Sequence, residues 1–167
     1  MIVYVLRHGQ AVERGTPGWP KDAARPLTSQ GERKLKQAAE AMEAMKISFE
    51  LILSSPYLRA RQTAEIIARA FRVRGGLEFS DALVPGGGVR KFIEQLAALK
   101  PEPESVLVVG HEPFLSEMVS RLLTGSVAPV IALKKGGLCK LTVESFKPVC
   151  RATLEWLLTP GQLAKIA

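Results

Sequence analysis

Three short apolar runs limit the folds open to this chain of 167 residues. The runs are Ile2–Leu6, Glu50–Ser54 and Ser105–Val109. Continuous runs of this kind are typical of strands that are buried on both faces, as in parallel sheets. Segments with helical spacing of apolar residues lie between them. This alternation predicts a single α/β domain over residues 1–167, with three layers in which helices flank a mostly parallel central sheet.

The first predicted helix follows a long polar loop, Gln10–Pro26, which is rich in Gly and Pro. We expect this helix to open around Thr28 with a capping box between Ser29 and Glu32, and to run to about Lys46. Its inward stripe is predicted to be Leu35, Ala38, Ala39 and Met42.

Further elements are expected along the rest of the chain. A second helix is predicted to start at Ser55–Pro56, with proline near the first turn. The other predicted helices are Val89–Leu99 and Phe114–Leu123. The other predicted strands are Leu77–Phe79, Val130–Leu133, Gly137–Val143 and Ala152–Leu157.

The two histidines of the chain, His8 and His111, each follow an apolar run directly. In open α/β sheets, ligands bind outside the carboxyl ends of the strands. If these two strands are parallel neighbours, both imidazoles lie at the same edge of the sheet. The helix after the run Glu50–Ser54 carries Arg59 in its first turns, and its positive end faces that edge.

Such a cluster has the chemistry of a phosphoryl-transfer site. Arg7 and Arg59 each offer a planar fork of donors that matches phosphate oxygens. Histidine can act as a nucleophile, an acid or a donor. Phosphoryl transfer needs mainly positioning, charge neutralisation and an in-line nucleophile. We therefore predict a site that uses no metal and no cofactor.

Each residue also has an ordinary structural interpretation. A histidine after a strand can be a hydrogen-bonded structural residue, Arg59 can belong to an exposed helix face, and Gly9 can simply end a strand. Two distant histidines with a carboxylate could also hold zinc, although the spacings typical of zinc sites are absent from the sequence. Only the coincidence of these residues at predicted strand ends favours a catalytic site.

Four segments resemble those of a known family. They are Leu-Arg-His-Gly at residues 6–9, Arg-Pro-Leu-Thr-x-x-Gly at 25–31, Ser-Pro-x-x-Arg-Ala within 54–64, and Val-Gly-His-Glu at 109–112. In this order they resemble the histidine phosphatase superfamily, also called phosphoglycerate-mutase-like. The short chain and the segment 156–165 are most similar to SixA-type phosphohistidine phosphatases.

The resemblance implies a role for each matching residue. His8 is expected to take the phosphoryl group covalently, Arg7 and Arg59 to grip its oxygens, and His111 to donate to it. We also place Gly9 among the substrate-binding residues. The glutamate acid of many family members has no clear match here. Asp22 is our candidate acid, with Asp81 and Glu112 as weaker candidates, and the role stays open.

The implied activity is hydrolysis of a phosphoryl group. The expected substrate is a phosphorylated protein, namely a phosphohistidine phosphotransfer domain. The alternatives are a small phosphoester and, as another class of protein, a non-catalytic phosphate-recognition module. The net charge of +7 fits an anionic partner, but no nucleic-acid-binding motif accompanies it, so nucleic acid is not expected to be the partner.

The remaining expectations come from composition. No apolar stretch approaches the ~20 residues of a membrane span, so no membrane partner is expected. No signal peptide is recognisable at the start of the sequence, which predicts a cytoplasmic protein. We also expect a monomer. Cys139 and Cys150 are expected to be thiols, buried or half-buried, because two cysteines form no disulfide framework.

Overall fold

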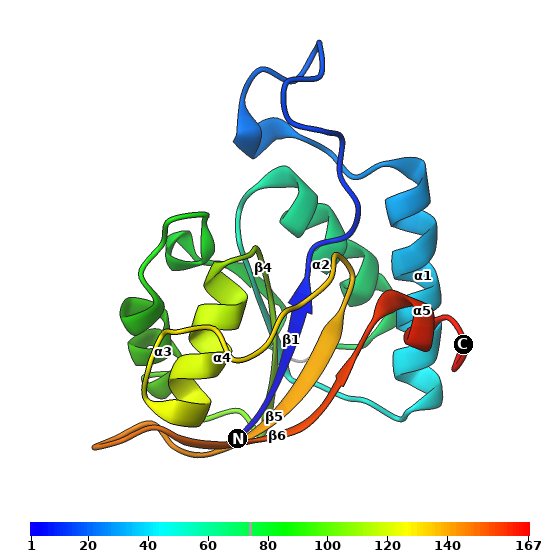
Figure 1. Ribbon diagram of the computed structural model, residues 1–167. Helices are drawn as coiled ribbons and strands as arrows, with labels where there is room; N and C mark the ends of the chain where they lie inside the picture. Colours follow the sequence, from blue (N-terminus) through cyan, green and yellow to red (C-terminus); the bar gives the residue numbers. More distant parts are fainter. Residues whose placement is uncertain (74) are drawn as a thin grey trace.

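A twisted central sheet organises the structure (Figure 1). The computed structural model describes residues 1–73 and 75–167. Within these residues, one sheet has the strand order β3-β2-β4-β1-β5-β6. The strands are β1 (Ile2–Arg7), β2 (Leu51–Ser54), β3 (Leu77–Phe79), β4 (Ser105–Gly110), β5 (Leu138–Ser145) and β6 (Arg151–Leu158). The first four of these are parallel, and β5 and β6 add an antiparallel edge. The predicted three-layer α/β fold is confirmed.

Helices cover both faces of the sheet (Figure 1). On one face lie α1 (Ser29–Ala44), α2 (Leu58–Ala70) and α5 (Pro160–Leu163). On the other lie α3 (Val89–Ala97) and α4 (Phe114–Thr124). Two 3-10 turns, Asp22–Ala24 and Asp81–Leu83, complete the elements. The layers form because each central strand is apolar on both sides.

Strand β1 shows how the two cores divide. Val3 and Val5 pack with α3 and α4, whereas Tyr4 and Leu6 pack with α1 and α2. Successive side chains of a strand point to opposite faces, so a fully apolar strand supplies both cores. Each such side chain contributes roughly 1.5–3 kcal/mol by burial. The strand that carries His8 at its end is therefore held firmly from both sides.

The strand registers bring the functional segments together. Arg7 of β1 lies opposite Gly110 of β4, and Ser54 of β2 lies opposite Val109 of β4. The residues that follow these positions leave the sheet at the same edge. His8, Ser55 and His111 consequently become neighbours, although they are far apart in the sequence.

The long loop after β1 projects above this edge of the sheet (Figure 1). Backbone hydrogen bonds close its base, from Val12 N–H to the Pro26 carbonyl (2.9 Å) and from Thr28 N–H to the Gln10 carbonyl (2.9 Å). The 3-10 turn at Asp22–Ala24 is the regular part of the loop. The loop thus leaves and rejoins the fold beside His8.

Several predicted helix boundaries need correction. The N-cap of α1 is Thr28, whose side chain accepts the Gly31 N–H at 3.0 Å, so the predicted capping box from Ser29 to Glu32 is wrong. Helix α1 ends at Ala44, and Lys46 has a left-handed φ of 55°. The predicted inward stripe of α1 is buried as expected.

Helix α2 starts later than predicted. It begins at Leu58 after an extended N-cap at Tyr57, and Pro56 lies outside it. The Ser55 hydroxyl accepts the Tyr57 N–H at 3.3 Å, which gives this segment a turn of its own before the helix. Helix α3 also ends at Ala97, two residues short of the predicted boundary.

The predicted strand Val130–Leu133 does not form, and this prediction was wrong. Leu133 is buried, but its backbone groups bond to side chains. Its N–H donates to Glu112 and its carbonyl accepts from Arg7. These contacts replace the ladder that a strand would require.

The remaining sequence expectations concern cysteines and membrane association. Cys139 is buried, Cys150 is half-buried, and both are free thiols, as predicted. None of the helices in residues 1–73 and 75–167 has the length and hydropathy needed to cross a bilayer.

Candidate active site

His8 is fixed in one tautomer by its own backbone. Its Nδ1 lies 2.7 Å from the Gly9 carbonyl oxygen. A carbonyl only accepts, so Nδ1 carries the proton and Nε2 keeps its lone pair. His8 is 6% exposed, so the lone pair is largely shielded from solvent. This is the tautomer that a nucleophilic imidazole needs.

The surroundings of His8 keep the ring neutral. Burial is the largest influence and lowers its pKa to about 3, although the Gly9 bond acts in the opposite direction. The positive charges of Arg59, Arg7 and Lys135 lower the pKa further. An unprotonated Nε2 is therefore available at neutral pH.

Arg59 lies in the first turn of α2 and is 3% exposed. Its Nε donates to His8 Nε2 at 3.2 Å. Its terminal nitrogens bond to the Asp22 carbonyl oxygen (2.8 Å) and to Asp22 Oδ2 (3.1 Å). Its guanidinium also lies over the Tyr57 ring, 5.3 Å from the centroid. Arg59 thus connects the proposed nucleophile to the loop.

Asp22 is the centre of an arginine cluster. Besides Arg59, its carboxylate pairs with Arg25 (2.8 Å) and with Arg14 (3.2 Å). Partial burial alone would raise the pKa of Asp22, but the bonds to Arg25 and Arg59 outweigh it and lower the pKa to about 2. An ionised carboxylate has no proton to donate. The geometry therefore favours orientation of Arg59 over the acid role expected from the sequence.

His111 faces His8 across the site. The two ring centroids are 5.0 Å apart, and His111 is 1% exposed. Its Nε2 bonds to the Ser55 hydroxyl at 2.8 Å. Its Nδ1 is buried and, among residues 1–73 and 75–167, has no hydrogen-bond partner. Burial, followed by the charges of His8 and Arg59, lowers the pKa of His111 to about 3, so this ring is neutral as well.

The Ser55 hydroxyl accepts the Tyr57 N–H, and it can either donate to His111 Nε2 or accept from it. If the hydroxyl donates, the ring proton of His111 is on Nδ1, which is the unpartnered atom. In that tautomer His111 offers a donor inside the site.

Arg7 is the last residue of β1 and lies opposite Gly110 of β4. Its Nη1 donates to the Leu133 carbonyl at 2.8 Å. Its Nε is buried without a partner in the described part of the chain. Burial lowers the pKa of Arg7, and the nearby carboxylate of Glu112 opposes that change. The guanidinium therefore has donors left for an anionic ligand.

Gly9 has a different role from the one expected. Its N–H donates to the Thr63 hydroxyl at 3.1 Å, and that hydroxyl donates to the Arg59 carbonyl at 2.7 Å. The amide is therefore occupied within the protein. A Cβ at Gly9 would lie 2.7 Å from a Leu35 methyl carbon, so a larger residue here would have to displace that buried side chain. Sequence reasoning gave no role in the site to Thr63, Ser55 or Leu133.

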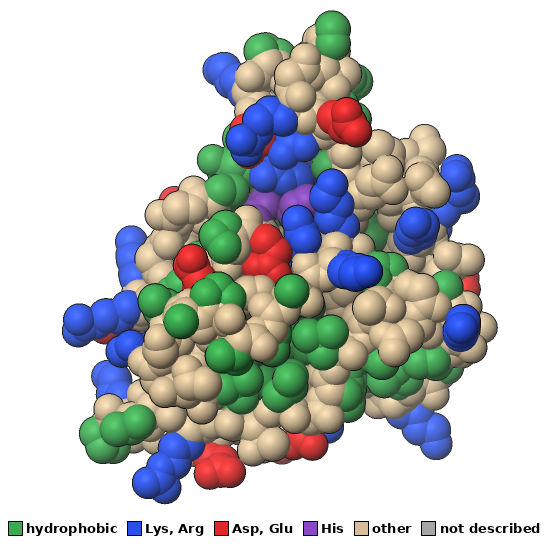
Figure 2. Space-filling view, in the orientation of Figure 1, with side chains coloured by type: hydrophobic (Ala, Val, Ile, Leu, Met, Phe, Trp, Pro, Cys, Tyr) green, Lys and Arg blue, Asp and Glu red, His purple; other side chains and the backbone are tan. Residues whose placement is uncertain are grey.

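Basic side chains border the site above and to the right of the two histidines, and acidic side chains lie below them (Figure 2). The chain's two histidines are visible between Lys and Arg side chains, below the projecting loop (Figure 2). A cavity of about 170 Å³ adjoins Gly9 and is lined in part by Lys34 and Lys135. The turn that carries Lys135 is clamped to β1, because Gly136 N–H donates to the carbonyls of Arg7 (3.0 Å) and His8 (3.1 Å).

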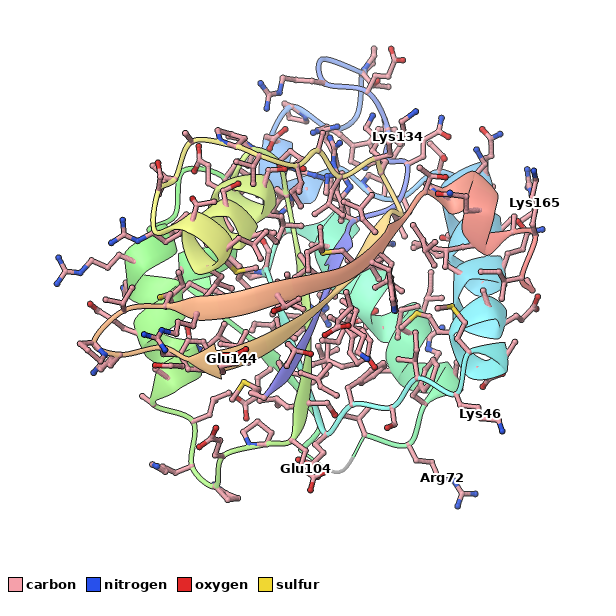
Figure 3. All side chains as sticks on the ribbon, turned by 60° about the horizontal axis from the view of Figure 1, so that its bottom comes forward. Lys46, Arg72, Glu104, Lys134, Glu144 and Lys165 are labelled. Atoms are coloured by element: carbon pink, nitrogen blue, oxygen red, sulfur yellow. The ribbon has the colours of Figure 1, made fainter. Side chains whose placement is uncertain are left out.

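Lys134 lies beside the projecting loop, whereas Lys46, Arg72 and Glu104 lie at the far end of the sheet (Figure 3).

The described residues contain no group of three His, Cys, Asp or Glu side chains that could hold a metal ion. The five residues Arg7, His8, Asp22, Arg59 and His111 thus meet at one sheet edge. Together they place two arginine side chains next to two neutral imidazoles.

Comparison with known proteins agrees with this geometry. Residues 3–83 match the profile of the histidine phosphatase superfamily (branch 1). A phosphohistidine phosphatase SixA homolog from Haemophilus influenzae is 32% identical over 73% of this chain and 77% of its own length. Phosphohistidine phosphatase SixA from Escherichia coli K12 is 29% identical over 98% and 96%.

A solved structure extends the likeness to three dimensions. The protein histidine phosphatase SixA in complex with tungstate superposes with a TM-score of 0.83 at 30% identity, covering 98% of this chain and 99% of that one. The chain belongs to the histidine phosphatase superfamily, and within it to the SixA type. The resemblance expected from the sequence motifs is confirmed.

Proposed function

We propose that this protein removes phosphoryl groups from phosphohistidine in a partner protein, through a covalent intermediate on His8 and without a metal ion. One observation carries the proposal. The Gly9 carbonyl holds the proton of His8 on Nδ1, so Nε2 presents a lone pair among Arg7, Arg59 and His111.

The first step is attack of His8 Nε2 on phosphorus, in line with the leaving imidazole of the substrate. The new N–P bond forms as the substrate N–P bond breaks, and the bonding pair stays with the leaving nitrogen. The other ring nitrogen of the substrate carries a proton, so the histidine leaves as a neutral imidazole, and the positive ring charge passes to phospho-His8, which keeps its proton on Nδ1. Arg7 and Arg59 neutralise the phosphoryl oxygens, as positioned cations do in phosphoryl transfer. His111 donates from Nδ1 to the transferring group.

The second step regenerates the enzyme. Water attacks the phosphorus of phospho-His8, the N–P bond breaks, and the electron pair returns to Nε2. Both protons of the water leave with the phosphate, as H₂PO₄⁻. The proton on Nδ1 stays with the Gly9 carbonyl throughout, so no further acid or base is required for balance.

The carboxylates near the pocket support a phosphohistidine substrate. Asp22 is ionised and paired with arginines. Glu112 accepts hydrogen bonds from Ser116 N–H, the Ser116 hydroxyl and Leu133 N–H. Neither is free to protonate a leaving alkoxide. An imidazole is a better leaving group than an alkoxide and needs such an acid less.

Basic side chains close to the site support a protein substrate. A cavity of about 170 Å³ next to Gly9 is lined in part by Lys34 and Lys135. Its lysines, Lys34 and Lys135, suit acidic side chains next to a phosphorylated histidine. The SixA relatives are named phosphohistidine phosphatases, and the same substrate class fits this chain.

The test compares kcat/KM on a phosphohistidine-bearing phosphotransfer protein with kcat/KM on aryl and sugar phosphates, all in EDTA. The proposal predicts a strong preference for the phosphoprotein and no effect of EDTA. A preference for a sugar phosphate would make the protein a small-molecule phosphomonoesterase. Binding of the phosphoprotein without turnover would make it a phosphate-recognition module, and strong inhibition by EDTA would point to a metal.

A further inference from the structure

We propose that Glu112 is a positioning residue that fixes the guanidinium of Arg7 through the backbone of Leu133. The inference rests on the proposed phosphoryl site and assigns a role inside it. Glu112 follows His111 directly in the sequence, at the end of β4. It contacts no group that would react.

The two backbone groups of Leu133 form a relay between these charges. Its N–H donates to Glu112 Oε1 at 3.0 Å, and its carbonyl accepts from Arg7 Nη1 at 2.8 Å. This carbonyl is the one protein acceptor that Arg7 has within residues 1–73 and 75–167. The direction in which Arg7 points therefore depends on where Leu133 is held.

Glu112 holds the backbone of Leu133, whose side chain is buried in the core beside α3 and α4. The segment around Leu133 belongs to no strand or helix, so regular backbone pairing does not fix it. The Glu112 carboxylate is itself anchored, by the Ser116 N–H at 3.1 Å and the Ser116 hydroxyl at 2.6 Å. The negative charge also lies close enough to Arg7 to favour its protonated form. One carboxylate thus joins the start of α4 to the phosphate-gripping arginine.

A purely structural interpretation is that Glu112 only caps α4. The two interpretations differ in what they predict for Ser116, which shares the carboxylate but has no link to Arg7. Loss of the Ser116 hydroxyl removes one of the two bonds that anchor the carboxylate, but it keeps the Ser116 N–H bond and both bonds of Leu133, to Glu112 and to Arg7. Ser116→Ala is therefore the matched control.

The experiment measures tungstate affinity by calorimetry, which requires no turnover, on Glu112→Ala, Glu112→Asp, Glu112→Gln and Ser116→Ala. We expect Glu112→Ala to weaken tungstate binding about tenfold, the scale of one hydrogen bond to a charged group. Glu112→Asp, which keeps the charge near α4 but is too short to reach both partners, is expected to weaken it similarly. Glu112→Gln keeps an oxygen acceptor and should recover most of the affinity, and Ser116→Ala should stay within twofold.

A double-mutant cycle with Arg7→Ala completes the test. If Glu112 acts through Arg7, Glu112→Ala has less than a twofold effect on tungstate affinity in the Arg7→Ala background. Additive losses of tungstate affinity in the double variant, or wild-type affinity in Glu112→Asp, would overturn the role proposed for Glu112. Neither result would contradict the proposed phosphoryl site. Unchanged affinity in Arg7→Ala by itself would overturn the proposed phosphoryl site, and the role of Glu112 with it. Glu112→Asp keeps the test decisive if Glu112→Ala does not fold.

Discussion

The Nε of Arg59 donates a hydrogen bond to His8 Nε2 at 3.2 Å. The atom proposed to attack phosphorus is therefore in contact with the cation proposed to grip the phosphoryl oxygens. A phosphoryl group that enters between them meets the lone pair and the charge together. The bond to His8 also distinguishes Arg59 from Arg61 of the same helix, which pairs with Glu65 on the exposed face.

Replacement of Arg59 by Ala is expected to lower kcat/KM by about 10²–10³-fold, the scale of losing one preorganised charge-stabilising donor. The control is Arg61→Ala, because Arg61 lies on the same helix but pairs with Glu65 on the exposed face. Steady-state kinetics on a phosphohistidine protein measure both. An effect below threefold at Arg59 would remove it from the site.

Asp22→Asn distinguishes an acid from an orienting carboxylate. The carboxylate is ionised and bonded to Arg59, so its loss should disturb the grip on every phosphorylated substrate. We expect similar fractional losses of kcat/KM on an aryl phosphate, an alkyl phosphate and a phosphohistidine protein. A loss confined to substrates with poor leaving groups would instead identify Asp22 as the proton donor.

The two buried histidines predict a pH dependence of stability. Each has a folded-state pKa of about 3 against an ordinary value of 6.5. Between those values the unfolded chain binds more protons, so the free energy of unfolding falls as the pH decreases from 6.5 toward 3. The slope is at most about 1.4 kcal/mol per pH unit for each ring.

Urea denaturation at pH 7.5 and pH 5 measures this dependence, and the His8→Gln/His111→Gln double variant is the reference. Asp22 does not contribute to that comparison, because its pKa of about 2 and its ordinary value of 3.8 both lie below pH 5. We expect the free energy of unfolding to fall more between pH 7.5 and pH 5 in the wild type than in the double variant. An equal fall in both proteins would show that the histidines are not held neutral.

Lys34→Glu tests recognition of the partner protein. Lys34 lines the cavity next to Gly9, whereas Lys36 is exposed on the same helix and does not line it. We expect Lys34→Glu to lower the ratio of kcat/KM for phosphohistidine protein over aryl phosphate by roughly three- to tenfold, since rim charges act mainly on association. Lys36→Glu should leave that ratio unchanged. Equal ratios in both variants would remove the cavity from partner recognition.

The sequence predicted the members of the site because strand ends are a simple geometric signal. His8 and His111 follow buried runs, and parallel pairing of β1 with β4 brings such residues to one edge. The sequence did not predict what holds each residue. The tautomer of His8 depends on a backbone carbonyl, and the orientation of Arg7 depends on Leu133, which lies 126 residues away in the chain.

Long-range hydrogen bonds also explain why the predicted strand Val130–Leu133 does not form. Its apolar residues satisfy the local pattern of a strand, but Glu112 and Arg7 bond the backbone of Leu133 instead. Long-range bonds from side chain to backbone leave no periodic signal in a sequence. The cap of α1 is a subtler case, because Thr28 and Ser29 are both good caps and only the backbone angles select Thr28.

The most direct measurement traps the intermediate. Wild-type protein is mixed for milliseconds with a phosphotransfer protein carrying ³²P-phosphohistidine, quenched in alkaline denaturant, and mapped by peptide. The account predicts alkali-stable label on the peptide that contains His8, and neither label nor turnover in His8→Gln. Turnover that persists in His8→Gln, or label on another residue, would contradict the central claim.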